Sequence, residues 1–312
     1  MTSIPSSPPV EVSVVIVSWN TRALLETCLA SVDGPAAGSA IDVVVVDNAS
    51  EDGSAEMVRR NFQNVRLIEN DENVGYARAN NQGIRAGRSD FVLLLNSDTQ
   101  LRHGVIERLA SFLRANPEVA AVGPRVANPD GSLQTSCYPT PTLFREFWRL
   151  FHLDALLPLG SYAMSRWDQI RPQEVEILLG ACILVRREAM ERVGLLNETY
   201  FMYSEDLDLC YRLRRDGGRI FWYPSAEIVH HGGQSTRQVS RQMFLQLYRS
   251  KLAFFRLYYG GLTAAVYKLI LLAASLARLG LSPLAALLCS RNRTLDIEQA
   301  YNYRQLIRAL LS

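Results

Sequence analysis

Val12-Ser13-Val14-Val15-Ile16-Val17 is a short, mostly β-branched run that leads directly into polar residues. Ile41-Asp42-Val43-Val44-Val45-Val46 and Phe91-Val92-Leu93-Leu94-Leu95 have the same form. The polar residues that follow the three runs are Ser18-Trp19-Asn20, Asp47-Asn48-Ala49-Ser50 and Asn96-Ser97-Asp98. Short apolar runs are typical of parallel strands buried on both faces, and open α/β sheets bind ligands beyond the carboxyl ends of such strands. The pattern therefore predicts one site shared by the three polar clusters.

The segments between the predicted strands have helical spacing. Residues 21–32 and 54–61 place apolar side chains three to four positions apart, and each segment is entered through a polar residue that can cap a helix. Because strand and helix alternate, about the first 100 residues are predicted to form an α/β sheet of nucleotide-binding type.

A second informative stretch is Phe201-Met202-Tyr203-Ser204-Glu205-Asp206-Leu207-Asp208-Leu209-Cys210-Tyr211-Arg212. It places three carboxylates among apolar and aromatic residues, unlike a solvated run of charge. Burial and neighbouring charge shift carboxylate pKa values toward those of a general base. The stretch is therefore a candidate general-base site, and the structural alternative is an acidic helix N-terminus favoured by the helix dipole.

Ordered motifs along the chain resemble those of the family 2 inverting glycosyltransferases, which have the GT-A fold. The first four are Val17-Ser18-Trp19-Asn20, Val46-Asp47-Asn48-Ala49-Ser50, Asn73-Val74-Gly75-Tyr76-Ala77-Arg78-Ala79-Asn80-Asn81-Gln82-Gly83 and Leu95-Asn96-Ser97-Asp98. Later segments resemble the rhamnosyltransferase-like branch: Gly180-Ala181-Cys182, Arg186-Arg187, Gly194, residues 201–212 and His230-His231-Gly232-Gly233-Gln234-Ser235. The resemblance covers residues 11–240 and implies a mainly parallel central sheet flanked by helices, with a C-terminal helical appendage.

The resemblance implies that a nucleotide-sugar donor binds at the strand ends. Asp47 is expected to accept a ring N–H of the donor's pyrimidine, and Ser18, Trp19 and Asn20 to line its base and ribose. The alternative for Asp47 is that it caps the following helix. The predicted donor-binding residues are Ser18, Trp19, Asn20, Asp47, Asn73, Gly75, Arg78, Asn96, Ser97, Asp98 and His231.

Asn96-Ser97-Asp98 stands where the family has an Asp-x-Asp signature, whose second carboxylate binds the metal that bridges the donor diphosphate. The resemblance therefore implies that Asp98 is a ligand of Mg²⁺ or Mn²⁺, which assist the departure of a diphosphate. An asparagine in the first position leaves one charge fewer and predicts a loosely held, donor-dependent ion. A simple Asn-Ser-Asp turn is the alternative.

His230 follows Glu227-Ile228-Val229 and stands just before a Gly-Gly pair, so a short strand is expected to present its imidazole at a tight turn. In the related enzymes the equivalent histidine completes the metal shell, and His230 is therefore the second expected ligand. The alternative is a hydrogen-bonded core histidine. His231 is expected to contact the diphosphate.

In an inverting transfer, one base takes the proton of the acceptor hydroxyl as it attacks the anomeric carbon. The resemblance places that base at Asp206, and Glu205 and Gly180 are expected to position the acceptor. Asp208 is expected to cap the helix or to pair with Arg212 four residues later. No Ser/His/Asp or Cys/His grouping indicates a covalent nucleophile, so single displacement is favoured.

Length and composition are typical of a cytosolic enzyme, with 312 residues of which 48% are hydrophobic. Five scattered cysteines without metal-ligand spacing indicate a reducing compartment. Residues 1–10 are predicted to be a disordered tail without a signal peptide.

The catalytic domain is expected at residues 11–240, with a donor half at 11–100 and an acceptor half at 101–240, followed by a basic helical segment at 241–312. Asn128-Pro129-Asp130-Gly131 is a turn signal, and the stretch rich in Arg, Phe and Trp from Pro139 to Trp167 is a candidate wall of the acceptor site.

Charge is distributed unevenly along the chain. From residue 237 onward there are eleven Lys and Arg against two acids, a net charge of +9, whereas the first 236 residues carry 22 bases and 29 acids, a net charge of −7. The basic residues flank an apolar segment, 262–289, whose longest uncharged run is shorter than the ~20 residues that a membrane span needs. The pattern predicts peripheral binding to anionic lipid headgroups.

The alternative for this segment is a helical hairpin, broken near Gly280-Leu281-Ser282-Pro283, that packs on the catalytic domain or on a second subunit. Nucleic-acid binding is not expected, because aromatic residues lie among the charges only at 254–255 and 258–259. A homo-oligomer is left open by the sequence.

The residues and the resemblance together predict an inverting glycosyltransferase that moves L-rhamnose from dTDP-L-rhamnose to a lipid-linked or polysaccharide acceptor. It would act in cell-envelope glycan synthesis, in the cytoplasm at the inner face of the plasma membrane. The sugar is implied by the resemblance, whereas the residues indicate only a pyrimidine diphosphate donor, so UDP-galactose and UDP-N-acetylglucosamine stay open. The other candidate classes are a nucleotidyltransferase, which has no use for a base at Asp206, and a catalytically silent sugar-nucleotide-binding or assembly module.

Overall fold

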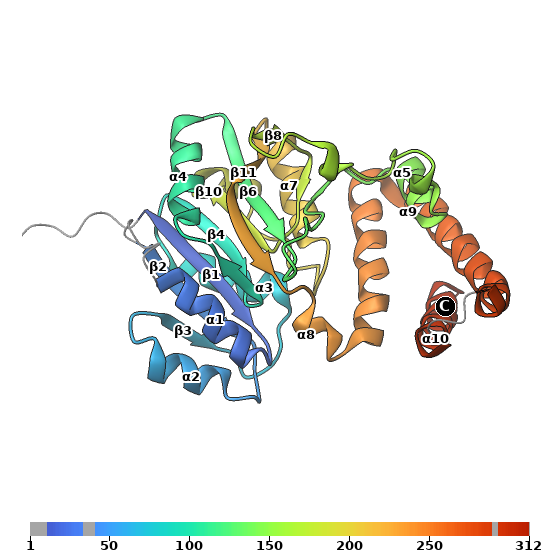
Figure 1. Cartoon of the computed structure of the whole chain (residues 1–312), viewed down its shortest axis with the longest axis horizontal. Coiled ribbons are helices and arrows are strands. Elements are labelled where there is room, and N and C mark those ends of the chain that lie inside the picture. The colour runs from blue at the N-terminus through green and yellow to red at the C-terminus, as the bar shows by residue number, and fades with distance from the viewer. Residues whose placement is uncertain (1–10, 34–40, 289–292, 312) are drawn as a thin grey trace, which may run out of the picture. The chain divides into compact units, whose positions relative to one another are not determined.

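The computed structural model describes residues 11–33, 41–288 and 293–311, and Figure 1 traces their helices and strands. The predicted tail, residues 1–10, lies outside the described residues. The chain forms two compact units that interleave along the sequence. The first unit comprises the described residues of Met1–Thr140, Met164–Phe201 and Glu205–Gln238, and the second those of Pro141–Ala163, Met202–Ser204 and Val239–Ser312.

The three predicted strands are present and pair in parallel, which confirms the sheet expected from the apolar runs. They are β1 (Val12–Ser18), β2 (Ile41–Asp47) and β4 (Phe91–Asn96), with β1 between the other two. Every residue of β1 is buried, as expected for a strand covered on both faces. The register pairs Ser18 with Asp47 and Val17 with Asn96, so the carboxyl ends of the strands lie side by side.

Beyond these strands the sheet becomes mixed. β3 (Arg66–Glu69) extends the parallel side, whereas β10 (Cys182–Arg186) lies antiparallel between β4 and β6 (Val119–Ala127). The full order is β3-β2-β1-β4-β10-β6-β11-β5, with β11 at Arg219–His230 and β5 at Thr99–Leu101. β8 (Gln173–Glu174) pairs with β11, and a separate small sheet pairs β7 (Cys137–Tyr138) with β9 (Ile177–Leu178).

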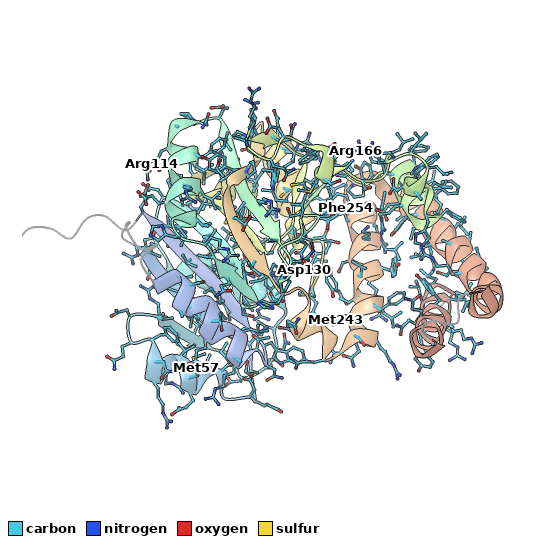
Figure 2. All side chains as sticks on the ribbon, viewed as in Figure 1. Met57, Arg114, Asp130, Arg166, Met243 and Phe254 are labelled. Carbon is cyan, nitrogen blue, oxygen red and sulfur yellow. The ribbon has the colours of Figure 1, made fainter. Side chains whose placement is uncertain are left out.

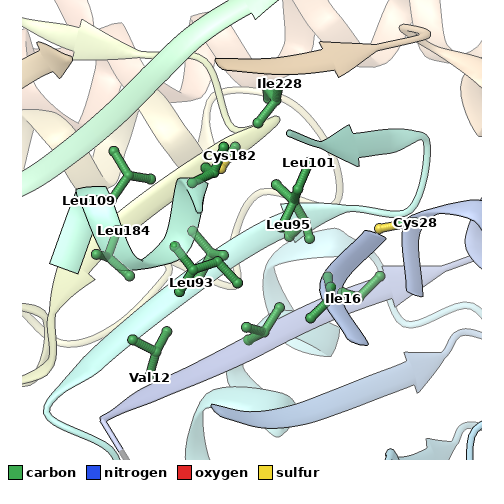
Figure 3. Packing of buried hydrophobic residues seen from close by; sticks show 14 of the residues in the cluster. Val12, Ile16, Cys28, Leu93, Leu95, Leu101, Leu109, Cys182, Leu184 and Ile228 are labelled. Carbon is green, nitrogen blue, oxygen red and sulfur yellow. The ribbon is translucent and has the colours of Figure 1, made fainter. Parts of the chain in front are cut away.

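Helices pack on both faces of the sheet. On one face, Val12, Val14 and Ile16 of β1 share a core with α1 (Arg22–Asp33), α2 (Ser54–Asn61) and α4 (Val105–Ala115), and Figure 3 shows this cluster at close range. On the other face, Val44 and Val46 of β2 pack with α3 (Tyr76–Ala86). The unit also contains η2 (Met164–Arg166), α6 (Arg187–Val193), α7 (Glu205–Arg215) and α8 (Gln234–Arg237).

The first two helices were predicted to be capped by the polar residues directly before them, but a single carboxylate, that of Asp52, accepts hydrogen bonds from the first turns of both. Asp52 Oδ2 accepts the N–H of Arg22 at 2.7 Å, and Asp52 Oδ1 accepts the N–H of Ser54 at 3.0 Å. The residue that precedes α2 is Gly53, whose side chain cannot cap. A pattern read within one segment missed this arrangement because the carboxylate lies 30 residues from the helix start at Arg22.

Close packing of α3 against the sheet depends on Gly83. A Cβ atom added at this position would lie 2.4 Å from Cγ1 of Val15 and 3.3 Å from Cγ2 of Val46. The helix therefore approaches β1 and β2 more closely than an alanine would allow, and this approach sets where its first residue, Tyr76, lies.

We expect Gly83→Ala to destabilise the first unit by about 1–3 kcal/mol, because overpacking forces the sheet and helix apart. Urea unfolding followed by circular dichroism would measure this. In a Val15→Ala background the colliding methyl group is gone, so the same substitution should cost clearly less. An equal cost in both backgrounds would show that the contact with Val15 does not limit the packing.

The second unit is helical. It contains α5 (Leu143–Leu150), η1 (Leu153–Ala155), α9 (Ser240–Leu288) and α10 (Arg293–Leu311). Its core includes Leu150 of α5, Phe255, Tyr267 and Leu271 of α9, and Leu306 of α10. The C-terminal segment therefore packs with residues 141–163, which the sequence placed in a candidate acceptor wall.

The predicted break in the long helix is wrong. The helix runs through Gly280–Pro283 and is interrupted instead at Gly260, where φ is 86° and ψ is 169°. Glycine permits a break without requiring one, and Gly280 does not adopt a positive φ. The interruption separates a segment that ends in Tyr258-Tyr259 from a second segment that begins at Gly261.

A buried carboxylate holds α5 to α9 in this unit. Glu146 is 4% exposed, and Lys251 Nζ and Arg149 Nη2 lie 2.8 and 2.7 Å from its two oxygens. The hydroxyl of Tyr267 donates to Glu146 Oε2 at 3.2 Å. Burial raises the pKa of Glu146, but Lys251 and Arg149 outweigh this effect and bring the pKa to about 2.

We expect Glu146→Gln to destabilise the second unit by about 3–5 kcal/mol at pH 7, because two cations lose their buried counter-charge. The folded pKa of about 2 lies below the ordinary value of 4.5, so the stabilisation is present above pH 4.5 and is lost as the pH falls toward 2. Thermal unfolding between pH 7 and pH 2 would therefore show the parent and the variant converging. A gap that stayed constant over this range would contradict the ion-pair account.

Candidate active site

The three polar clusters converge, as predicted, at the carboxyl ends of β1, β2 and β4. The N–H of Asn48 donates to Ser18 O at 2.8 Å, and the N–H of Asn20 donates to Ser50 Oγ at 2.9 Å. Thr21 Oγ1 lies 2.9 Å from Ser97 Oγ, which connects the loop after β1 to the loop after β4. One edge of the sheet therefore carries all three clusters.

Asp47 is buried and only partly satisfied. Its Oδ2 accepts the N–H of Ser50 at 2.9 Å, which closes the turn 47–50. Its Oδ1 is buried and has no hydrogen-bond partner among the described residues. The capping alternative is not what the structure shows, since Asp52 caps α2. A buried acceptor without a donor is costly, and a ligand N–H would remove that cost.

The other residues predicted around the base and ribose hold the two loops in shape. Ser18 Oγ lies 3.0 Å from Thr21 Oγ1, so the hydroxyls of Ser18 and Ser97 are both engaged inside the protein. Asn20 has a φ of 52°, and its Oδ1 accepts the N–H of Glu51 at 2.8 Å. Trp19 is half-buried beside it. A groove of about 610 Å³ is lined by Asn20, Thr21, Arg22, Ala23, Leu24, Glu26, Asp52, Gln234 and Gln238.

A network of side-chain amides shapes the loop before α3, and sequence reasoning missed its centre, Asn48. Asn48 Nδ2 donates to Asn73 Oδ1 at 2.8 Å, and Asn48 Oδ1 accepts from Asn70 Nδ2 and the N–H of Val74. Asn73 Oδ1 also accepts the N–H of Gly75. The loop is thus held by side-chain hydrogen bonds between separate segments, which the secondary-structure propensities of the residues do not reveal.

The same loop contacts the residue at which the acidic stretch begins. Gly75 has a φ of 86°, and a Cβ added there would lie 2.7 Å from Phe201 O. The N–H of Tyr76 donates to the same carbonyl at 2.7 Å. Only glycine allows this approach, which joins the donor half of the predicted site to the acidic stretch. Arg78, one turn further, is exposed on α3.

Asp98 and His230 meet at the end of β11. Both are 7% exposed, and His230 Nε2 lies 3.2 Å from Asp98 Oδ1. Burial raises the pKa of Asp98, but the hydrogen bond and charge of His230 and the N–H of Gln234 outweigh it, and the pKa is lowered. The N–H of His231 donates to Asp98 O at 3.0 Å. Within the described residues, no group of three His, Cys, Asp or Glu side chains could hold a metal.

Asn96, at the first position of the signature, turns its carbonyl oxygen away from this pair. Asn96 Oδ1 accepts from the hydroxyl of Tyr76 at 2.7 Å, and Asn96 Nδ2 lies 3.5 Å from His230 Nε2. The hydroxyl of Tyr76 also lies 3.4 Å from Gly180 O. The sequence did not identify Tyr76 as a site residue, although Tyr76 stands in the motif 73–83. Its role becomes visible only from its contacts with Asn96 and Gly180, which are 20 and 104 positions away.

Asp206 begins α7 and is held by backbone donors. Its Oδ2 accepts the N–H of Gly180 at 2.9 Å, and its Oδ1 accepts the N–H of Leu207 at 2.7 Å. A Cβ added at Gly180 would lie 3.3 Å from the Asp206 side chain, so glycine permits this contact. Burial raises the pKa of Asp206, against the lowering effect of the two N–H groups.

Glu205 and Asp208 have different surroundings. Glu205 is buried, and its Oε2 has no hydrogen-bond partner among the described residues. Burial and the charge of Asp206 raise the pKa of Glu205 well above 4.5. Asp208 is fully buried and pairs with Arg212 Nε at 2.6 Å, which confirms the predicted pairing.

A mixed sheet flanked by helices, with polar residues gathered at the carboxyl ends of its parallel strands, is the GT-A fold. The chain belongs to glycosyl transferase family 2, whose family model matches residues 13–194, and it is a glycosyltransferase. This membership confirms the family that the motifs resembled.

Three comparisons support this assignment. The chain is 35% identical over 237 residues to N-acetylglucosaminyl-diphospho-decaprenol L-rhamnosyltransferase of Mycobacterium tuberculosis, across 72% of this chain and 76% of the relative. It is 27% identical over 243 residues to the low-salt glycan biosynthesis hexosyltransferase Agl10 of Haloferax volcanii, across 75% and 72%. The mannosyltransferase PcManGT from Pyrobaculum calidifontis, solved with GDP-Man and Mn²⁺, has a TM-score of 0.58 at 20% identity, covers 98% of this chain and 87% of that one, and confirms the fold.

We expect Glu205→Gln to stabilise the protein at neutral pH and to change little at pH 4. The folded pKa of Glu205 lies above 4.5, so its burial begins to cost stability as the pH rises past 4.5, and the cost grows until the folded pKa is reached. Urea midpoints at pH 4, 6 and 8 would show a difference that widens with pH. A difference independent of pH would show that Glu205 ionises normally.

Proposed function

We propose that this glycosyltransferase transfers a sugar in one displacement with inversion at the anomeric carbon, and that Asp206 is its base. The acceptor oxygen forms a bond to the anomeric carbon, the bond to the diphosphate oxygen breaks, and the hydroxyl proton passes to the Asp206 carboxylate. The observation that carries the proposal is the hydrogen bond from the N–H of Gly180 to Asp206, because it holds a carboxylate of raised pKa at a fixed place. Glu205, whose raised pKa favours its protonated form, can hydrogen-bond the acceptor without competing for that proton.

The proposed donor is dTDP-L-rhamnose. The named activity of the mycobacterial relative supports the sugar, and the unpartnered Oδ1 of Asp47 supports a pyrimidine, since uracil and thymine each offer a ring N–H. Guanine also has a ring N–H, but that group lies farther from the ribose than the N3–H of a pyrimidine. UDP-sugars satisfy the same oxygen and are the second candidate.

Asp98 and His230 fit a divalent cation, since they offer a carboxylate oxygen and an imidazole nitrogen 3.2 Å apart in a buried position. An imidazole ligand suits Mn²⁺ better than Mg²⁺, which prefers oxygen ligands. When bound, such a cation would neutralise charge on the departing diphosphate. Two protein ligands leave most of the coordination shell to the diphosphate, which supports an ion that binds together with the donor.

The proposed acceptor is a lipid-linked glycan at the inner face of the plasma membrane, in cell-envelope glycan synthesis. The name of the mycobacterial relative, which contains a diphospho-decaprenol, supports this acceptor class. The second unit supports a membrane location, since it carries twelve Lys and Arg against four Asp and Glu. Anionic headgroups attract such a surface by about 1 kcal/mol for each nearby charge.

One face of α9 in this unit is apolar and exposed. Leu262, Leu269 and Leu276 are each more than half exposed and recur every seven residues, while Tyr267 and Leu271 face the core. By length and composition, Ser240–Gly280 could cross a membrane, with a mean hydropathy of 1.6 and 28% of the window buried. The interruption at Gly260 and the core contacts of the opposite face support binding along the membrane surface instead.

We expect calorimetry with Mn²⁺ to detect tighter binding of dTDP-rhamnose than of UDP-glucose, UDP-galactose or GDP-mannose. Asp47→Ala should weaken the binding of dTDP-rhamnose and of the UDP-sugars, and it should leave the weak binding of GDP-mannose unchanged. Preference for a UDP-sugar would replace the proposed donor while keeping the mechanism. Preference for GDP-mannose would contradict the role of Asp47.

We expect Asp206→Asn to bind donor normally and to lose transfer by several orders of magnitude, because the amide cannot take the acceptor proton. Asp216→Asn, at an exposed position just after the same helix, is the matched control and should retain activity. In the parent, kcat/KM should fall with decreasing pH at a value above the ordinary pKa of 3.8, since the pKa of Asp206 is raised. Normal turnover of Asp206→Asn would remove Asp206 from the base role.

We expect the full chain to float with vesicles that contain phosphatidylglycerol and to float less with neutral phosphatidylcholine vesicles. Leu262→Gln combined with Leu269→Gln should reduce flotation, because both side chains lie on the exposed apolar face. Ile170→Gln is the matched control, since Ile170 is 76% exposed in the first unit. Equal flotation of the double variant and the parent would contradict the assigned face.

A further inference from the structure

Gln134 lies against the side of the His230 ring that faces away from Asp98. Gln134 Oε1 is 2.7 Å from His230 Nδ1, whereas Nε2 of the ring faces Asp98. The backbone N–H of Gln134 donates to Val126 O at 2.9 Å, which holds this residue beside the end of β6. The contact spans 96 residues, so neither segment reveals it alone.

The orientation of the Gln134 amide is fixed by its other contacts. Gln134 Nε2 donates to Asn128 Oδ1 at 2.8 Å and lies 3.4 Å from His230 O. A backbone carbonyl can only accept, so the amide nitrogen must face it and the amide oxygen must face the ring. An amide oxygen also only accepts, and Nδ1 of the ring therefore carries hydrogen in this contact.

With Nδ1 held by Gln134, Nε2 is the ring nitrogen that faces Asp98 Oδ1, 3.2 Å away. This nitrogen and the carboxylate oxygen, both buried, are the pair proposed above to hold a cation. We infer that Gln134 is a positioning residue, which fixes the His230 ring so that Nε2 is the nitrogen offered to the cation. The inference rests on the proposed metal pair and adds a partner that orients it.

The turn before Gln134 braces this arrangement. The N–H of Gly131 donates to Asn128 O at 2.9 Å, and Asn128 Nδ2 lies 2.9 Å from Ser132 Oγ. Asp130, labelled in Figure 2, accepts the N–H of Ser132 at 2.9 Å. The predicted turn Asn128-Pro129-Asp130-Gly131 is confirmed, and it holds Asn128 Oδ1 where Gln134 can donate to it.

The test is the affinity of the full chain for Mn²⁺ in the presence of dTDP, measured from the electron paramagnetic resonance signal of free Mn²⁺. Gln134→Leu keeps the size of the side chain and removes the acceptor, so Mn²⁺ affinity should fall by about 10- to 100-fold. Gln134→Glu keeps an acceptor at Nδ1 and should recover much of that loss. Thr135→Val, the exposed neighbour, should match the parent.

A second readout needs no metal. The ¹⁵N chemical shifts of His230 should show hydrogen on Nδ1 in the parent and a shift toward hydrogen on Nε2 in Gln134→Leu. Unchanged shifts together with unchanged Mn²⁺ affinity in Gln134→Leu would overturn the inference. His230→Ala separates the two proposals: if it lowers Mn²⁺ affinity and Gln134→Leu does not, only the positioning role fails, and if it has no effect, the metal pair itself fails.

Discussion

Parallel pairing of three largely apolar strands is the constraint on which the rest of the first unit depends. Because β1 is buried on both faces, its backbone must find partners in β2 and β4, and the register that results sets Ser18 beside Asp47 and Val17 beside Asn96. A slip of one residue would exchange the two faces of the core, so the register is strongly specified. The loops after the strands are then joined by hydroxyl and amide contacts that no single loop could make.

Buried acids fall into two groups, and the difference indicates where ligands are expected. Glu146 and Asp208 are fully paired with Lys251 and Arg212, and they hold helices together. Asp47 and Glu205 each keep a buried oxygen without a partner among the described residues. Native proteins seldom leave such groups unsatisfied, and the exceptions concentrate where a substrate supplies the missing donor. Both exceptions lie in the first unit, in the region that the strand ends define.

Much of the first unit could be predicted from local pattern, since strand periodicity and family motifs are properties of short segments. The convergence of the clusters and the pair Asp208–Arg212 followed from such patterns. Contacts between distant segments could not be predicted, among them the double cap by Asp52, the hydroxyl of Tyr76 between Asn96 and Gly180, and the amide of Gln134 on His230. The break in α9 was misplaced because a Gly-Leu-Ser-Pro sequence favours a turn, whereas the backbone geometry at Gly260 depends on packing that the sequence does not display.

The acids already present around position 96 explain why an asparagine rather than an aspartate suits this position. Burial raises the pKa of Tyr76, and Glu205, Asp206 and Asp98 add to the rise, so three acids already surround its hydroxyl. An aspartate at position 96 would add another acid beside them and raise the cost of folding without a cation. Asn96 instead accepts from the hydroxyl of Tyr76, and its Nδ2, which carries no charge, lies 3.5 Å from His230 Nε2. Under the proposed function, this arrangement lowers the affinity of the protein for a metal ion in the absence of donor. Bound donor then raises the affinity for the cation, and bound cation raises the affinity for the donor by the same factor, since coupling between two ligands is reciprocal.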